Sequence, residues 1–221
     1  MQNHYSPAHL AVIAILMIML VSFIQLGALS LAFYKLGLSA DSALSLLFAS
    51  LLGSIINLPL FRLPAEAPAE PPPTRLFGLL RPLQPPFLGT TLVAINAGGG
   101  LVPLGFSLYL MQHSTATLAE FAFIIFGVSL ISYLISRPVH GIGIGMPIFV
   151  APITAALLAL SINPEQAAAL AYCGGTLGVL IGADLLRLKD ILKMGTPVAS
   201  IGGAGTFDGI FITGIVAVLL T

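Results

Sequence analysis

Long apolar runs separated by short polar stretches dominate the chain. A helix needs about 20 apolar residues to cross the hydrocarbon core of a bilayer. Seven segments reach that length: residues 9–34, 42–62, 87–111, 115–136, 139–161, 165–186 and 197–220. The pattern predicts an all-α, polytopic membrane protein whose single transmembrane domain occupies residues 1–221.

Glycine and proline interrupt this pattern in two ways. The stretch 63–86, "LPAEAPAEPPPTRLFGLLRPLQPP", is too rich in proline for a continuous helix, so we expect an exposed loop there. Clusters inside the third, fifth and seventh segments predict breaks near Gly98–Pro103, Gly141–Pro147 and Ile201–Asp208. Irregular backbone within a membrane is tolerated only inside protein or along a wet cavity, so three breaks at one depth indicate a cavity that faces the cytoplasm.

Composition supports the membrane interpretation and excludes several classes of function. The chain is 57% hydrophobic and 7% charged, whereas about 25% of residues are charged in soluble domains. Zero net charge gives no basic surface for nucleic acid. The only cysteine, Cys173, excludes an internal disulfide and a thiolate cluster, and we expect neither a metal nor a cofactor.

The distribution of basic residues predicts an orientation. With seven spans, one side of the membrane receives seven lysines and arginines and the other receives only Lys35. Basic residues favour the cytoplasmic side, so we expect a cytoplasmic N-terminus and an external C-terminus. The seven are Arg62, Arg75, Arg81, Arg137, Arg187, Lys189 and Lys193.

Two glycine faces predict close helix packing. Gly174, Gly178 and Gly182 recur every four residues in the sixth segment, and Gly205, Gly209 and Thr213 do so in the seventh. Small residues at this spacing let helix backbones approach each other. We therefore expect these faces to bring the last two spans together.

Three acidic residues fall inside predicted spans, where a charge costs roughly 2.5–3.5 kcal/mol and indicates function by default. Glu120 lies about one turn from the external end of its span, where its side chain can reach the interface. Asp184 has Arg187 three residues away, so an ion pair between them is an alternative to a functional role. Asp208 has no basic residue closer in sequence than Lys193, and capping of a broken helix is its structural alternative.

Asp184 and Asp208 lie on consecutive spans joined by a short loop, so antiparallel packing can place them side by side. Two close carboxylates cannot both ionise, and one then holds a proton. In such a dyad one carboxylate activates water and the other protonates the carbonyl oxygen. The two aspartates are our candidate catalytic residues.

Polar and glycine positions near the breaks are candidates for substrate binding. Asn96 could instead form a hydrogen bond with backbone that the break frees. His140 could instead be solvated at the membrane interface. The candidates are Asn96, Gly98, Gly99, Gly100, His140, Gly203 and Gly205.

Four stretches together resemble an uncharacterised family of prokaryotic membrane proteins, a domain of unknown function: "NAGGGLVPLGFSLYLM", "RPVHGIGIGMP", "GTLGVLIGADLLRL" and "SIGGAGTFDGIF". This resemblance covers the third to seventh segments and implies a prokaryotic cytoplasmic membrane. Gly182-Ala183-Asp184 is also partly similar to the Gly-x-Gly-Asp motif of intramembrane aspartyl proteases, which implies peptide hydrolysis.

Three functions are consistent with the sequence. The first is an intramembrane aspartyl hydrolase that cleaves a membrane-embedded peptide. The second is a small transporter or channel that passes a small solute along broken helices. The third is a non-catalytic scaffold subunit. The expected partner in each case is the lipid bilayer, and a homo-oligomer is compatible with all three.

Overall fold

The computed structural model of the chain describes residues 22, 25–66, 87–139, 143–193, 195–203 and 209–221. A helix at Gln25–Lys35 comes first. The elements that follow are α2 (Ala40–Gly53), β1 (Asn57–Pro64), β2 (Thr90–Asn96), a π-helix (Ala97–Leu101), α3 (Val102–His113), α4 (Leu118–Ile135), β3 (Arg137–Val139), β4 (Gly143–Gly145), α5 (Val150–Ile162), a 3-10 turn (Pro164–Gln166), α6 (Ala167–Val179), a second π-helix (Leu180–Leu185), α7 (Leu188–Leu192), β5 (Val198–Ile201) and α8 (Gly209–Leu220).

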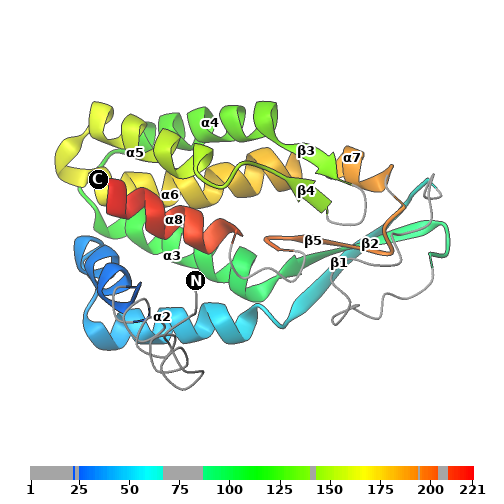
Figure 1. Ribbon diagram of the computed structural model, residues 1–221, viewed down its shortest axis with the longest axis horizontal. Coiled ribbons are helices and arrows are strands. Elements are labelled where there is room, and N and C mark those ends of the chain that lie inside the picture. The colour runs from blue at the N-terminus through cyan, green and yellow to red at the C-terminus, as the bar shows by residue number, and fades with distance from the viewer. Residues whose placement is uncertain (1–21, 23–24, 67–86, 140–142, 194, 204–208) are drawn as a thin grey trace, which may run out of the picture.

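Helix α6 is the centre of a helical bundle. It packs against α4, α5, α8 and α3, and almost all of its residues are buried (Figure 1). Leu170 and Cys173 have no exposed surface, and Tyr172 meets Phe106 of α3 edge to face at 5.0 Å between ring centroids. Apolar and small residues all round α6 explain why it can occupy the interior.

A three-stranded sheet lies at one end of this bundle (Figure 1). Its order is β1-β2-β5. Strand β1 is antiparallel to β2, with Asn57 opposite Asn96, and β5 is parallel to β2, with Ile201 opposite Ile95. We call this end of the bundle the junction end: α4 and α6 finish there, and α8 begins there. A short β3–β4 hairpin lies at the same end.

The described chain is chiefly helical, as expected, and part of it has the length and composition of membrane spans. Within the described residues, Leu118–Ile135 and Pro164–Leu185 are long and apolar enough to cross a bilayer. Gln25–Lys35 and Ala40–Gly53 would add a third span if the pair, bent by 111°, counts as one. Leu118–Ile135 and Pro164–Leu185 match the predicted segments 115–136 and 165–186, and the bent pair overlaps the predicted segments 9–34 and 42–62.

Four of the predicted spans are not continuous helices. Segment 42–62 passes from α2 into β1, 87–111 begins as β2, and 197–220 begins as β5. Proline interrupts "NLPLFRLP" in β1, and β-branched residues fill "TTLVAIN" in β2, so both stretches favour extended backbone. In segment 139–161, α5 begins only at Val150 and has 13 residues.

The three predicted breaks are confirmed as far as the structure describes them. Residues 97–101 form the first π-helix. Residues 146–149 are irregular between β4 and α5. After β5, Gly202 and Gly203 both have positive φ angles, 84° and 138°, which favour glycine. Residues 140–142 and 204–208 lie outside the described chain.

Candidate functional site

Two strand–glycine–helix units meet at the junction end. Strand β2 leads through the first π-helix into α3, and β5 leads through Gly202 and Gly203 towards α8. Because β2 and β5 are parallel neighbours, the glycines that follow them lie at the same end of the strands, the carboxyl end. A Cβ atom built on Gly202 would lie 2.6 Å from the Cα atom of Gly100, so the backbones of the two segments are in direct contact. We call this region, formed by Gly98, Gly99, Gly100, Gly202 and Gly203, the glycine junction.

Helix α2 closes the junction from another side. A Cβ atom on Gly98 would collide with the backbone of Ser50 and Ser54, and one on Gly53 would lie 2.9 Å from the Gly98 nitrogen. Only residues without side chains allow three backbones to converge so closely. Gly98, Gly99 and Gly100, which the sequence marked as substrate-binding, therefore pack closely against neighbouring segments, and their part in substrate binding stays a prediction.

Asn96 holds the junction together through hydrogen bonds. Its side chain is buried, and its Oδ1 accepts the Gly99 N–H at 2.8 Å. Its Nδ2 donates to the Ser54 carbonyl at 2.7 Å and to Asn57 Oδ1 at 3.1 Å. Asn96 thus satisfies backbone that the helix break frees, which is the structural alternative noted from the sequence.

Two residues that sequence reasoning missed complete this network. Ser50 Oγ donates to the Gly98 carbonyl at 2.7 Å, and Ser200 Oγ of β5 donates to Asn57 Oδ1 at 2.5 Å. The signal available for Ser50 was its position four residues before Ser54 in an otherwise apolar segment. No comparable signal marked Ser200.

Asp184 lies on the second π-helix, where α6 ends beside the junction. Its carboxylate Oδ2 accepts the Gly202 N–H at 2.7 Å, and the residue is partly buried. π-Helical turns are frequent at functional sites because they shift a side chain out of the regular helical register. Asp184 is therefore the described acid that touches the glycine junction.

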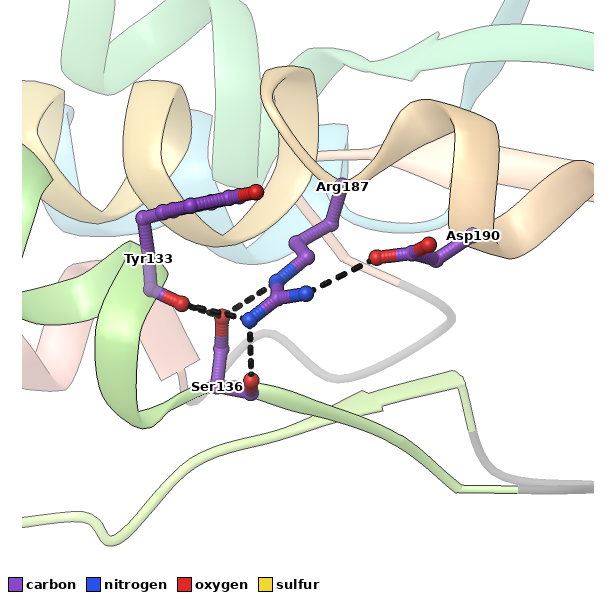
Figure 2. A network of polar contacts seen from close by, with 4 residues as sticks. All are labelled: Tyr133, Ser136, Arg187 and Asp190. Carbon is purple, nitrogen blue, oxygen red and sulfur yellow. Dashed lines mark hydrogen bonds and ion pairs between the residues drawn. The ribbon is translucent and has the colours of Figure 1, made fainter.

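Arg187 does not pair with Asp184 in the way the sequence allowed. Its Nη1 binds Asp190 Oδ2 at 2.9 Å, and this is the one ion pair found within the described residues. Its Nη2 donates to the carbonyls of Tyr133 at 2.6 Å and Ser136 at 2.8 Å, as Figure 2 shows. The guanidinium also lies over the Tyr133 ring, 4.3 Å from its centroid. Arg187 thus caps the carbonyl groups at the end of α4, whereas the Asp184 carboxylate accepts the Gly202 N–H.

The depth of Asp184 follows from the packing of its helix. Gly182 faces Ser129 and Ser132 of α4, and α4 ends at Ile135. At 1.5 Å per residue, Asp184 therefore lies within about 5 Å of the end of α4 along the bundle axis. The acid is close to the boundary of the candidate spans rather than at their middle.

The glycine face of α6 packs against a different partner from the one expected. Gly174 meets Ile124, Gly178 meets Val128, and Gly182 meets Ser129, all on α4. Contact with α8 uses Gly175, which faces Thr213, and Gly214 of α8, which faces Thr176. The last two spans do pack closely, as predicted, with Thr213 in the contact, but the face through Gly174, Gly178 and Gly182 meets α4 instead.

Glu120 has a structural role at the far end of the bundle. It forms a capping box with Thr117 at the start of α4, and its Oε1 accepts from Asn163 Nδ2 at 3.1 Å. These bonds tie the start of α4 to the turn before α6, which removes Glu120 from the candidate site.

Several predicted site residues cannot be placed. Asp208, His140 and Gly205 lie outside the described residues. Gly203 is described and half-buried, one residue after the Gly202 N–H that Asp184 accepts. The pairing of Asp184 with Asp208 accordingly stays a prediction.

Comparison of the chain with known proteins identifies one family. Residues 51–220 match the family described as "Protein of unknown function (DUF1614)". No curated protein and no solved structure matches the chain. The match confirms the resemblance to an uncharacterised family, whereas the resemblance to Gly-x-Gly-Asp proteases gains no support.

Proposed function

The chain belongs to this DUF1614 family, and we propose that it is an integral membrane hydrolase that cleaves peptides at the cytoplasmic boundary of the bilayer. Asp184 and Asp208 are the proposed carboxylate dyad. The observation that carries the proposal is the hydrogen bond between Asp184 and Gly202, which brings α6 to the segment that leads to Asp208.

The outer surface of the bundle supports a location in the membrane. Phe123, Phe126 and Leu134 of α4 are 59%, 67% and 63% exposed. Large exposed apolar surfaces on soluble proteins mark interaction sites, and a helix covered by them is well solvated by lipid. We propose seven crossings, and in four of them the helix is preceded or followed by a strand at the junction end.

Charge supports the proposed orientation. At the junction end the described chain carries five basic residues and three acids, whereas the far end carries Lys35 and three acids. The positive-inside rule then places the junction end in the cytoplasm. The sheet belongs outside the hydrocarbon core on this side, because open strand edges do not face lipid.

The antiparallel packing of α6 and α8 supports the dyad. Gly175 faces Thr213 and Gly214 faces Thr176, and α8 begins at the end of the bundle where α6 finishes (Figure 1). The chain passes Asp184 at Gly202, and α8 begins at Gly209, the residue after Asp208. The part that Asp208 plays in the proposal rests on this position in the sequence.

The proposed reaction uses one ionised and one protonated carboxyl group. The ionised group takes a proton from water while the water oxygen bonds to the amide carbon, and the protonated group gives its proton to the carbonyl oxygen. The C–N bond then breaks, the nitrogen takes a proton, and the products are a carboxylic acid and an amine. The shallow position of Asp184 supports this proposal, because a site near the boundary of the bilayer can be reached by water.

The sheet supports a peptide as the substrate. Within the described residues, β5 forms the edge of the sheet that leads to Gly202, whose N–H binds Asp184. An extended peptide can add to such an edge through main-chain hydrogen bonds. Hydrolysis of a peptide bond requires this extended form, because a helix buries its amides.

The test compares newly formed protein N-termini in membranes that contain wild-type, Asp184→Asn or Asp208→Asn protein. We expect cleavage products with the wild type and their loss in both variants. Asp190→Asn is the matched control, since Asp190 is a carboxylate at the same end that pairs with Arg187. Products that persist in both Asp184→Asn and Asp208→Asn would contradict the hydrolase.

Transport is the second candidate, and the paired strand–glycine–helix units favour it. Helices α3 and α8 have 12 residues each and start at breaks, as the half-helices of transporters do. Vesicles with a trapped pH dye and an imposed potential test this function. Proton flux that Asp184→Asn abolishes, without any peptide cleavage, would favour transport. Normal behaviour of Asp184→Asn in both assays would favour a scaffold.

A further inference from the structure

We propose that a pocket between the end of β1 and α7 binds the headgroup of an anionic phospholipid through its phosphate. The proposal rests on the membrane location proposed above but not on hydrolysis. The pocket has a volume of about 240 Å³ and lies apart from Asp184 and the glycine junction. Its lining residues are Pro64, Ala65, Glu66, Lys189, Leu192 and Lys193.

A backbone contact fixes the two walls of this pocket relative to each other. The Glu66 N–H donates to the Leu192 carbonyl at 3.2 Å, and the Ala65 N–H donates to the Gly89 carbonyl at 3.1 Å. The chain that leaves β1 is therefore attached both to α7 and to the segment before β2. The pocket is a defined feature of the fold.

Two lysines supply uncompensated positive charge. Lys189 and Lys193 are one helical turn apart, both are exposed, and neither has an ion pair or hydrogen bond within the described residues. Asp190, which lies between them in sequence, is bound by Arg187. Glu66 is the one acid in the lining, so the pocket carries two cations and one anion.

The position of the pocket favours a lipid over a free phosphate ion. The candidate span ends at Leu185, and Leu185 and Leu186 are 44% and 54% exposed. Lys189 follows Leu185 by one turn, which places its ammonium group at the level of the headgroups. Pro64, Ala65 and Leu192 provide apolar walls that suit the glycerol and upper acyl region of a phospholipid.

The experiment titrates purified full-length protein in detergent with short-chain phosphatidylglycerol and counts bound lipids by native mass spectrometry. We expect retention of phosphatidylglycerol in preference to phosphatidylcholine of the same chain length. Each lysine beside an anionic headgroup contributes about fivefold, so Lys189→Ala with Lys193→Ala should weaken binding about 25-fold.

Two variants separate a defined pocket from diffuse attraction. Ala65→Leu fills the pocket without changing the charge and should also weaken retention, whereas Arg137→Gln removes a cation at the same end outside the pocket and should change it less than about twofold. Equal losses in Arg137→Gln and the double lysine variant would overturn the site. Equal retention of both lipids, or displacement by millimolar inorganic phosphate, would also contradict a lipid site.

Failure of this proposal can be told apart from failure of the membrane assignment. Extraction of membranes with alkaline carbonate reports whether the chain is integral, independently of any bound lipid. A chain that resists extraction but shows no preference for phosphatidylglycerol would refute the pocket alone.

Discussion

The α6 face and the glycine junction use glycine for two different purposes. On α6, Gly174 and Gly178 meet side chains of Ile124 and Val128, and the helix continues without interruption. At the junction, Gly98 and Gly202 meet backbone atoms, and the regular helix is lost. Side chains can move to admit a methyl group, but backbone cannot move without shifting an element. Glycine spacing alone therefore does not distinguish a packing face from a break.

The largest effect is expected for Gly202→Ala. Gly202 has φ 84°, and an added Cβ atom would lie 2.6 Å from the backbone of Gly100. Strain and overpacking should together destabilise the fold by about 3 kcal/mol or more. Thermal unfolding in detergent measures this change. Gly105→Ala is the matched control, because no atom lies within 4 Å of its added Cβ, and it should be neutral or stabilising. Equal melting temperatures for the two variants would abolish the distinction.

A smaller effect is expected on the α6 face. An added Cβ atom on Gly178 would lie 2.6 Å from side-chain atoms of Val128, which can partly rearrange, so Gly178→Ala should destabilise by about 1–3 kcal/mol. At Gly175 the nearest atom is 3.4 Å away, and alanine there should cost less than about 0.5 kcal/mol. Unfolding of both variants in the same detergent gives the comparison. Gly175→Ala as damaging as Gly178→Ala would show that α6 is not packed as described.

An intermediate effect is expected for Arg187, which joins α7 to the end of α4. Arg187→Ala removes two bonds to carbonyls and the pair with Asp190, and should destabilise by about 1–2 kcal/mol. Lys193→Ala, which removes an exposed cation nearby, should stay within about 0.5 kcal/mol. Hydrogen exchange at the end of α4 should increase in Arg187→Ala alone. Unchanged exchange there would rule out the capping role.

A small effect on stability is expected for Asp184→Asn, the conservative change at the candidate site. The amide oxygen of asparagine can still accept the Gly202 N–H, so the fold should lose less than about 1 kcal/mol. Asp184→Leu leaves that N–H without an acceptor and should cost about 1–3 kcal/mol. A comparison of both variants with wild type by thermal unfolding separates the structural role of Asp184 from its chemical role. Equal stability of the two variants would show that the bond to Gly202 contributes little.

The sequence predicted the breaks well because glycine and proline act locally. "NAGGGLVP" and "SIGGAG" concentrate residues of low helix propensity within a short stretch. The strands were missed because residues 57–64 and 90–96 are short apolar runs, and hydrophobicity alone does not separate a strand from part of a buried helix.

The sequence could not predict which helix packs against the glycine face of α6 or which acid pairs with Arg187. The face through Gly174, Gly178 and Gly182 indicates close packing but does not say whether α4 or α8 supplies the neighbour. Arg187 has an acid three residues away on either side, Asp184 and Asp190. The structure selects Asp190 because the chain leaves the π-helix at Leu186, which turns Arg187 towards the end of α4.

The central claim, that Asp184 and Asp208 form one site, is tested most directly by a disulfide between these two positions. In a Cys173→Ala background, Asp184→Cys with Asp208→Cys introduces the only thiols, and a disulfide requires Cα atoms within about 7 Å. Asp190→Cys with Asp208→Cys is the control pair. The account predicts rapid oxidation of the 184/208 pair in folded protein and free thiols in the control. Thiols at 184 and 208 that stay reduced in folded protein would contradict the dyad.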